Sequence, residues 1–220
     1  MLDGIKQKYS ASDLAYHIIV PSLPGYAYSS GPPIDKDAAM TDMSRICNKF
    51  MEALGFGDGY VAQGGDLGSM VSRQSAGHFD ACKAYHLNMV HTPPPKNADQ
   101  LEVQEIEKRA KPRGDTWLDT GTAYGQEHGT RTATIGLVLS SSPIAMLAWY
   151  AIYFLPVCIL EETVLTSLVR IGEKFLQWSD EDPPLEQILE SVTLYWLTDT
   201  FPRCIYPYRS VCGHHTFLDQ

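Results

Sequence analysis

The most informative stretch of the chain is Gln63-Gly64-Gly65-Asp66-Leu67-Gly68-Ser69, because a short strand is predicted to enter it and a helix to leave it. Gly64, Asp66 and Gly68 match the G-x-nucleophile-x-G pattern of a sharp strand-to-helix turn, whose strained backbone leaves no room for a Cβ at the flanking positions. The N-terminus of the following helix favours negative charge, so Asp66 is expected to stay ionised and nucleophilic. The N–H group of Leu67 would then form half of an oxyanion hole.

Other interpretations of this turn involve different chemistry. A dinucleotide-binding fingerprint would need a glycine where Gln63 stands, and a phosphate-binding P-loop would need a Gly-Lys-Ser/Thr sequence that this turn lacks. Ser69 falls inside the predicted helix rather than at the turn, which makes it a poor nucleophile. An ordinary strand-to-helix turn with Asp66 as the helix N-cap stays open as the purely structural alternative.

The segments around this turn alternate between strand and helix patterns. Short apolar runs predict strands, and apolar residues at helical spacing predict the helices between them. This alternation is typical of a parallel sheet covered by helices, so the predicted fold class is α/β. In chain order the predicted elements are a buried strand at 16–20, a helix at about 36–54, a strand at 59–63, a helix at 70–78 and a strand at 84–90.

The character of the sequence changes after Pro93-Pro94-Pro95. Residues 99–113 are charged with a helical pattern, residues 116–128 are mixed, and residues 184–195 form another helix candidate. This half has no convincing strand pattern. We therefore expect a partial α/β core over residues 1–95, which carries the nucleophile turn, and a helical cap over residues 96–220.

Charge and composition limit the partners. Seventeen basic and 26 acidic side chains give a net charge of −9, which argues against a nucleic acid or an anionic membrane as partner. The five cysteines include no CxxC pair, and no histidine spacing completes a zinc site, so we expect neither a metal nor a cofactor. Unpaired cysteines, with no apolar signal segment at the N-terminus, predict a cytoplasmic protein.

Several separated motifs resemble, in their order along the chain, the epoxide hydrolases of the α/β-hydrolase fold, in particular the fungal soluble members of the microsomal branch. The resemblance covers nearly the whole chain except one internal block and the tail, and it implies a partial α/β-hydrolase fold with a helical cap. The matching motifs are Pro21-Ser22-Leu23-Pro24-Gly25-Tyr26, the stretch from Gly59 to Ser69, His86-Leu87-Asn88, the stretch from Tyr124 to Arg131, the stretch from Ser142 to Trp149, and Tyr195-Trp196-Leu197-Thr198.

The resemblance implies that Asp66 attacks an epoxide carbon and forms a covalent ester, with a vicinal diol as the final product. Two cap tyrosines of the family protonate the departing oxygen, and the matched motifs place them on Tyr124 and Tyr208; Tyr206 fits the spacing less well. A phenol stays neutral at pH 7 and still protonates a far more basic alkoxide. The implied partner is a small-molecule epoxide, from fungal secondary metabolism such as toxin biosynthesis or from detoxification.

The resemblance also predicts that parts of the family's machinery lie outside this chain. The family's histidine base and its acid partner follow the second tyrosine at a distance, and the loop that donates the other oxyanion N–H precedes the first strand predicted here. The chain therefore resembles an epoxide hydrolase truncated at both ends, which would form an ester on Asp66 without turning it over. Two alternatives stay open: a haloalkane dehalogenase, which also uses an aspartate at this turn but needs no tyrosine pair, and a non-catalytic remnant or epoxide-binding protein.

Residues 150–170 form an atypical apolar insertion that interrupts the family pattern between Trp149 and Ile171. A small intron that has been translated would explain the block, and the transcript sequence across this junction tests that hypothesis. Alternatively, the stretch from Thr132 to Leu160 contains no charged residue and is long enough to cross a bilayer. We expect no membrane span, because Ser140-Ser141-Ser142-Pro143 and Pro156 interrupt the stretch.

Overall fold

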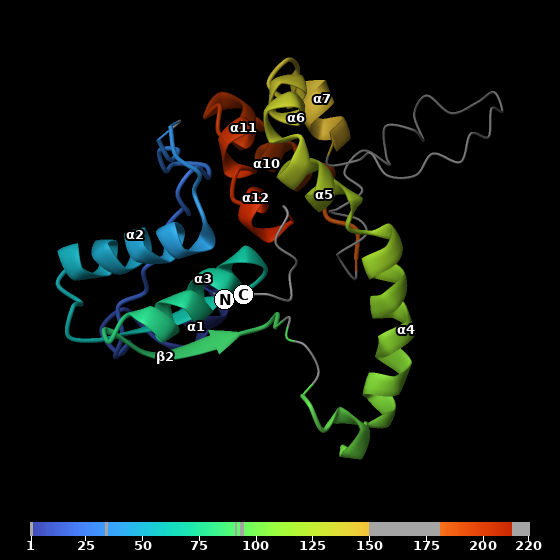
Figure 1. The fold of residues 1–220 in the computed structure, drawn as a ribbon. Coiled ribbons are helices and arrows are strands. Elements are labelled where there is room, and N and C mark those ends of the chain that lie inside the picture. Colours follow the sequence, from blue (N-terminus) through green and yellow to red (C-terminus); the bar gives the residue numbers. More distant parts are fainter. Residues whose placement is uncertain (1, 34, 91, 93–94, 150–180, 213–220) are drawn as a thin grey trace.

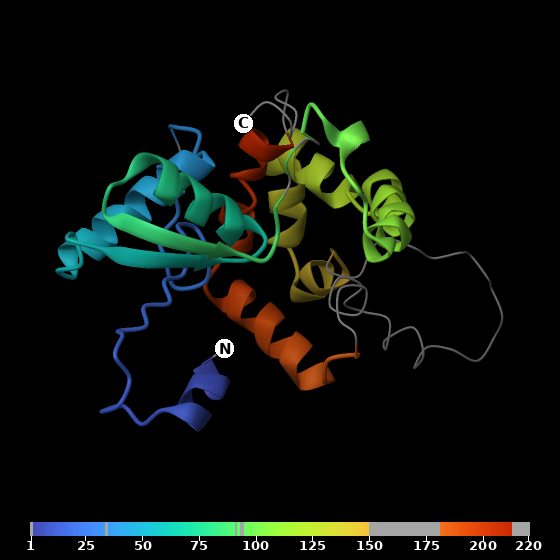
Figure 2. The ribbon, with the colours of Figure 1, turned by 90° about the horizontal axis from the view of Figure 1, so that it is seen from below.

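The computed structural model describes residues 2–33, 35–90, 92, 95–149 and 181–212. Its α/β part holds two parallel strands, β1 (Tyr60–Gly64) and β2 (Cys82–Leu87), joined by the crossover helix α3 (Leu67–His78). Helix α2 (Met40–Ala53) packs against α3, so both helices cover the same side of the strand pair (Figures 1 and 2). The strand–helix–strand unit predicted around Asp66 is therefore confirmed, with its strands in parallel.

The ends of the helices differ from the prediction by a few residues, and hydrogen bonds at the first turns explain why. Helix α2 begins at Met40 rather than near residue 36, because the carboxylate of Asp42 accepts a hydrogen bond from the backbone N–H of Ala39 at 3.3 Å and caps the first turn; Ala39 has no side-chain oxygen, so only this half of a capping box is present. Helix α3 begins at Leu67 rather than at residue 70, because the side chain of Asp66 accepts a bond from the first N–H of the helix.

The buried strand predicted at residues 16–20 is wrong. This segment has no strand pairing, and Tyr16 and Val20 are 77% and 73% exposed. Within the described residues β1 and β2 pair only with each other, so this segment has no strand partner. The β-branched run Ile18-Ile19-Val20 has a high β-propensity, but that propensity depends on packing within a sheet and forms no strand by itself.

The described residues that follow β2 form helices and no strand, as expected for this half of the chain. The described chain also begins with a helix, α1 (Leu2–Lys8). After β2 come a short 3-10 helix η1 (Ala98–Gln100) and the helices α4 (Glu105–Thr120), α5 (Ala123–Thr130), α6 (Thr132–Leu139), α7 (Pro143–Trp149), α10 (Leu185–Leu197), α11 (Phe201–Cys204) and α12 (Tyr208–Val211).

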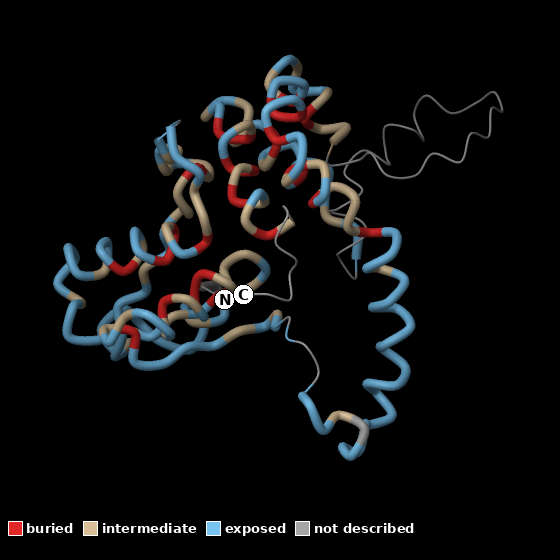
Figure 3. Tube along the Cα trace, viewed as in Figure 1, coloured by how far each residue is buried: buried red, intermediate tan, exposed pale blue. Residues whose placement is uncertain are grey.

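Two clusters of buried apolar residues form the core, and their segments are red in Figure 3. The helical cluster joins α6, α7, α10 and α11, and the sheet-side cluster joins α2, α3 and α12. Tyr26 packs against both clusters, so its loop connects the α/β part to the helices. The helical cluster is Ile135, Leu139, Met146, Val192, Phe201, Cys204 and Ile205, and the sheet-side cluster is Met40, Met43, Val71 and Val211.

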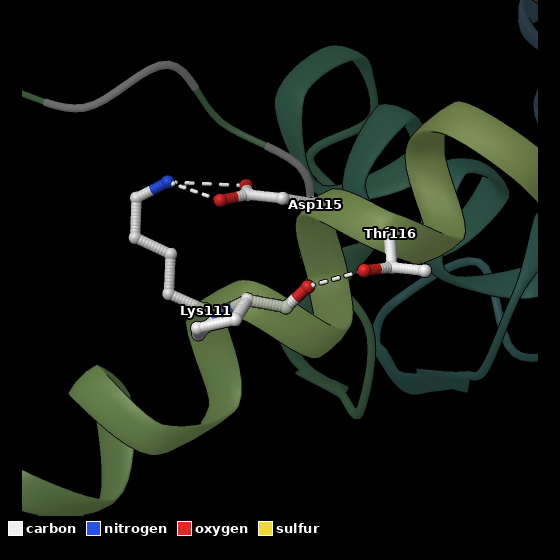
Figure 4. Close-up of polar contacts among 4 residues, drawn as sticks. Lys111, Asp115 and Thr116 are labelled. Carbon is white, nitrogen blue, oxygen red and sulfur yellow. Dashed lines mark hydrogen bonds and ion pairs between the residues drawn. The ribbon is translucent and has the colours of Figure 1, made fainter.

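Helix α4 stands apart from both clusters, and none of its residues is buried (Figures 1 and 3). Lys111 contacts the two carboxylate oxygens of Asp115 at 2.7 and 3.0 Å, and the hydroxyl of Thr116 donates to the carbonyl of Pro112 at 2.9 Å (Figure 4). Pro112 lies inside the helix and lacks a backbone N–H, so it removes one helical hydrogen bond. An exposed ion pair at this spacing contributes only about 0.3–0.5 kcal/mol, so α4 gains little stability from its charges.

Residues 132–149, the first part of the apolar stretch weighed as a membrane span, form the two short helices α6 and α7 with a break at residues 140–142. In the part of the chain that the structure describes, no helix combines the length and the apolar composition that crossing a bilayer requires. The insertion predicted at 150–170 lies outside the described residues.

We predict that Leu139→Ala lowers the free energy of unfolding by about 2–5 kcal/mol, because it removes a side chain from the helical cluster that is only 1% exposed. Leu137 lies on the same helix and is 74% exposed, so Leu137→Ala is the matched control and should change stability by less than about 0.5 kcal/mol. Urea unfolding followed by circular dichroism measures both variants. Similar losses in the two variants would contradict this packing.

Candidate active site

Asp66 lies between β1 and α3 with φ +49° and ψ −126°. A positive φ is uncommon for a residue other than glycine, and ordinary helix N-caps have extended dihedrals with negative φ. Strained backbone of this kind is typical of nucleophile turns. The side chain does cap α3, but the backbone strain favours the nucleophile turn over the ordinary cap.

The crowding predicted around this turn exists at one of its two flanking glycines. A Cβ on Gly64 would lie 2.0 Å from the carbonyl oxygen of Gly68, because the start of α3 passes directly against the end of β1. A Cβ on Gly65 would lie 2.6 Å from the side-chain oxygen of Asn88. A Cβ on Gly68 would have no atom of the described chain within 4 Å. The expectation of no free space is therefore right for Gly64 and wrong for Gly68, which contributes its backbone carbonyl to the crowding and has open space around its own Cβ position.

The two carboxylate oxygens of Asp66 have different surroundings. The backbone N–H of Leu67, the expected oxyanion donor, donates to Oδ1 at 2.6 Å. Oδ2 has no hydrogen bond among the described residues, and Asp66 as a whole is exposed. The hydroxyl of Ser69 donates to the carbonyl of Gly64 at 2.9 Å and is buried, which argues against Ser69 as a nucleophile. The turn thus holds one carboxylate oxygen and leaves the other available.

The structure brings Tyr124 of α5 and Tyr208 of α12 together, with ring centroids 6.0 Å apart and ring planes at 70°. Burial raises the pKa of Tyr124, and the negative charge of Asp66 raises it further. A hydrogen bond with Tyr208 lowers the pKa by a smaller amount, and the result is a pKa of about 12. Burial, followed by the neighbouring Tyr124 and Asp66, raises the pKa of Tyr208 even more strongly. Both phenols stay protonated at neutral pH. Tyr208, rather than Tyr206, is therefore the tyrosine that faces Tyr124.

A third tyrosine, Tyr26, joins these groups, although no sequence pattern assigned it a role. Its N–H donates to the carbonyl of Leu23 at 2.8 Å, and Gly25 between them has φ +86°, the positive value that this type of turn needs. Burial raises the pKa of the Tyr26 phenol well above its usual range, and Tyr208 and Asp66 add to the effect. The Pro24-Gly25 turn is visible in the sequence, but the direction of the tyrosine side chain depends on distant helices.

His128 is the described histidine that contacts the tyrosine pair. It is 5% exposed, lies one helical turn after Tyr124, and accepts a hydrogen bond at Nε2 from the indole N–H of Trp149 at 2.8 Å. Burial lowers the pKa of His128 from 6.5 to about 4, so its ring is neutral at pH 7. The sequence motif contains this histidine, but its spacing does not reveal a contact with Tyr208 from another helix.

We predict that Gly64→Ala lowers the free energy of unfolding by about 1–3 kcal/mol, because the new Cβ forces backbone atoms of β1 and α3 apart. Gly68→Ala is the matched control: its Cβ meets open space, and alanine favours a helix over glycine by up to about 1 kcal/mol. Thermal unfolding ranks the two variants. A Gly64→Ala protein as stable as Gly68→Ala would show that the two glycines do not differ in this way.

We predict that the free energy of unfolding falls by about 3 kcal/mol between pH 6.5 and pH 4 on account of His128, whose pKa is about 4 in the folded chain and near 6.5 when unfolded. In this range the unfolded chain binds the proton more tightly, so stability is lost as the pH falls. His128→Phe removes the titration, and urea unfolding at several pH values compares it with the wild-type protein. The same pH dependence in both would contradict a buried neutral histidine.

Comparisons with known proteins agree with this architecture. A family model described as the alpha/beta hydrolase fold matches residues 5–116. A candidate epoxide hydrolase of Dothistroma septosporum is 48% identical over 211 residues, which cover 95% of this chain and 45% of that protein. A second candidate epoxide hydrolase, from Stigmatella aurantiaca, is 32% identical over 193 residues, which cover 84% of this chain and 38% of that protein. The chain thus spans less than half the length of these relatives.

Solved structures extend the similarity to the helical half. The structure of Aspergillus niger epoxide hydrolase matches with a TM-score of 0.79 and 45% identity, over 94% of this chain and 49% of that chain. Juvenile hormone epoxide hydrolase from the silkworm Bombyx mori matches with a TM-score of 0.56 at 21% identity, which shows a shared fold. On this evidence the chain belongs to the α/β-hydrolase fold family, and within that family its sequence and structure are similar to those of epoxide hydrolases.

Proposed function

We propose that this chain performs the ring-opening step of an epoxide hydrolase, with Asp66 as the nucleophile and Tyr124 and Tyr208 as the proton donors. One observation carries the proposal: two partly buried phenols, Tyr124 and Tyr208, contact each other near enough to Asp66 for its charge to raise the pKa of both, while Leu67 holds one oxygen of the carboxylate. The similarity to proteins named as epoxide hydrolases supports it.

In the proposed step, Oδ2 of Asp66 attacks one carbon of the epoxide and forms an ester bond, and the bond between that carbon and the epoxide oxygen breaks. The electron pair of the broken bond goes to the oxygen, which takes a proton from Tyr124 or Tyr208. The resulting tyrosinate regains its proton from water. The raised pKa values ensure that both phenols hold a proton when the substrate arrives, and an alkoxide is still basic enough to remove it.

Hydrolysis of the ester to a vicinal diol would complete the activity of the whole protein. That step needs a base that activates water against the ester. No described histidine forms a hydrogen bond or an ion pair with Asp66, and Nε2 of His128 is occupied by Trp149. We therefore propose that the ester formed on this chain persists.

The proposed substrate is a small neutral epoxide, produced in secondary metabolism or met during detoxification. Among the described cysteines, Cys47, Cys82, Cys204 and Cys212 are free thiols, which is usual in a reducing compartment. We infer a cytoplasmic location on that basis.

We predict that incubation with styrene oxide adds the mass of one epoxide to the intact chain, and that peptide mapping places the adduct on Asp66. Asp66→Asn keeps the shape of the side chain but removes the attacking charge, so it should form no adduct. Tyr124→Phe and Tyr208→Phe should each slow adduct formation by about tenfold or more, since a positioned general acid contributes roughly 10²–10⁴-fold and one phenol remains in each variant. Tyr206→Phe is the matched control and should react at the wild-type rate.

Incubation with a bromoalkane distinguishes the haloalkane dehalogenase alternative. An adduct from the bromoalkane that forms equally fast in Tyr124→Phe would favour that alternative, because a halide leaves without a proton. An adduct on a cysteine instead of Asp66, or none at all, would overturn the proposed function.

A further inference from the structure

His128 takes no part in the ring-opening step, but its ring contacts both proposed acids. Its centroid lies 4.8 Å from that of Tyr208 and 5.7 Å from that of Tyr124, and each pair of ring planes meets at 84°. Phe201 of α11 packs against the same imidazole at 6.2 Å. Edge-to-face contacts of this kind favour a defined angle between aromatic rings, so they orient the rings as well as fill space.

The sequence of α5 explains how three rings from two helices meet. Tyr124 and His128 are four residues apart and therefore share one face of the helix. Gly125 and Gly129 repeat the same spacing beside them, and there α12 approaches closely: a Cβ on Gly129 would lie 2.9 Å from the backbone oxygen of Tyr208. The glycines thus admit α12 to the position at which Tyr208 reaches both rings of α5.

Trp149 of α7 fixes the orientation and the tautomer of the imidazole. Its indole N–H donates to Nε2 of His128 at 2.8 Å, and the two rings lie 5.7 Å apart at 33°. Because the indole nitrogen can only donate, Nε2 must be the unprotonated nitrogen and Nδ1 must carry the hydrogen. Burial keeps the ring neutral at pH 7 by lowering its pKa to about 4.

The remaining nitrogen of His128 takes no part in the contacts between the rings. Nδ1 is buried and has no hydrogen-bond partner among the described residues. A buried polar atom without a partner is unfavourable, and a purely apolar ring would fill the same space without it. The ring of His128, and not this nitrogen, therefore makes the contacts with Tyr124 and Tyr208.

We propose that His128 is a positioning residue, whose ring holds Tyr124 and Tyr208 at the mutual orientation in which both hydroxyls reach one epoxide oxygen. The proposal rests on the function proposed above, but it makes a separate claim about how the two acids are held. The imidazole exchanges no proton and touches no reacting atom in this role. Trp149 acts one step further away, by locking the imidazole.

The test compares two ring-less variants with one that keeps the ring, in the full chain. His128→Ala and His128→Gln lose the ring, and His128→Gln still offers Trp149 an acceptor; His128→Phe keeps the ring without the acceptor. His78→Ala is the control, since His78 is exposed on α3 and bonds the carbonyl of Gln74. Nuclear Overhauser contacts between the rings of Tyr124 and Tyr208, in tyrosine-labelled protein at pH 7, report the positioning directly. Adduct formation with styrene oxide, followed over a range of concentrations, reports its effect on the reaction.

We expect the ring-less variants to lose the contact between the tyrosine rings and to form the adduct at least tenfold more slowly at saturating epoxide, with little change in the half-saturating concentration. His128→Phe should keep the contact and react within about threefold of wild type. A change in adduct amplitude with an unchanged rate constant would indicate a loss of folded protein and overturn the proposal. A retained ring contact in His128→Gln would overturn it as well. If the wild-type chain forms no adduct, the proposed function fails, while the ring contacts still decide the role of His128.

Discussion

The close approach of Gly64 to the carbonyl of Gly68 is the constraint on which the candidate site depends. Only glycine lets the end of β1 pass so near the start of α3, and the chain between them must turn within two residues. Asp66 stands at that turn with a positive φ. In this conformation the backbone N–H of Leu67 donates to Oδ1 of the Asp66 carboxylate. The parallel pairing of β1 and β2 fixes the turn at the carboxyl edge of the strands, where helices of the second half can face it.

The site combines two environments that suit opposite chemical tasks. Asp66 lies at an exposed turn in front of the N-terminus of α3. Tyr124 and Tyr208 lie among buried aromatic rings, where removal from water favours the neutral, protonated phenol. The exposed carboxylate and the partly buried phenols therefore lie in different surroundings. Tyr26 belongs to both sides, since it packs against both apolar clusters.

The local features of the fold were predictable from the sequence, and the features that depend on distant contacts were not. The turn at Asp66 and the strands beside it follow from short-range patterns of glycine and apolar residues. Residues 16–20 carry the same kind of β-branched signal, but a strand also needs a partner, and that is a property of the whole sheet. Tyr124 and Tyr208 could be assigned only through the resemblance, because two tyrosines far apart in sequence carry no sign that they meet. His128 and Tyr26 were missed for the same reason.

The strand pair has a consequence for how this chain behaves among other polypeptides. Within the described residues each of the two strands is paired along one edge only, so the opposite edge of each has no strand partner. Natural sheets usually shield such edges, since they accept strands from neighbouring molecules. Val61 and Tyr85 add exposed apolar surface on these strands. A further strand that joins this sheet would therefore pair along one of these two edges.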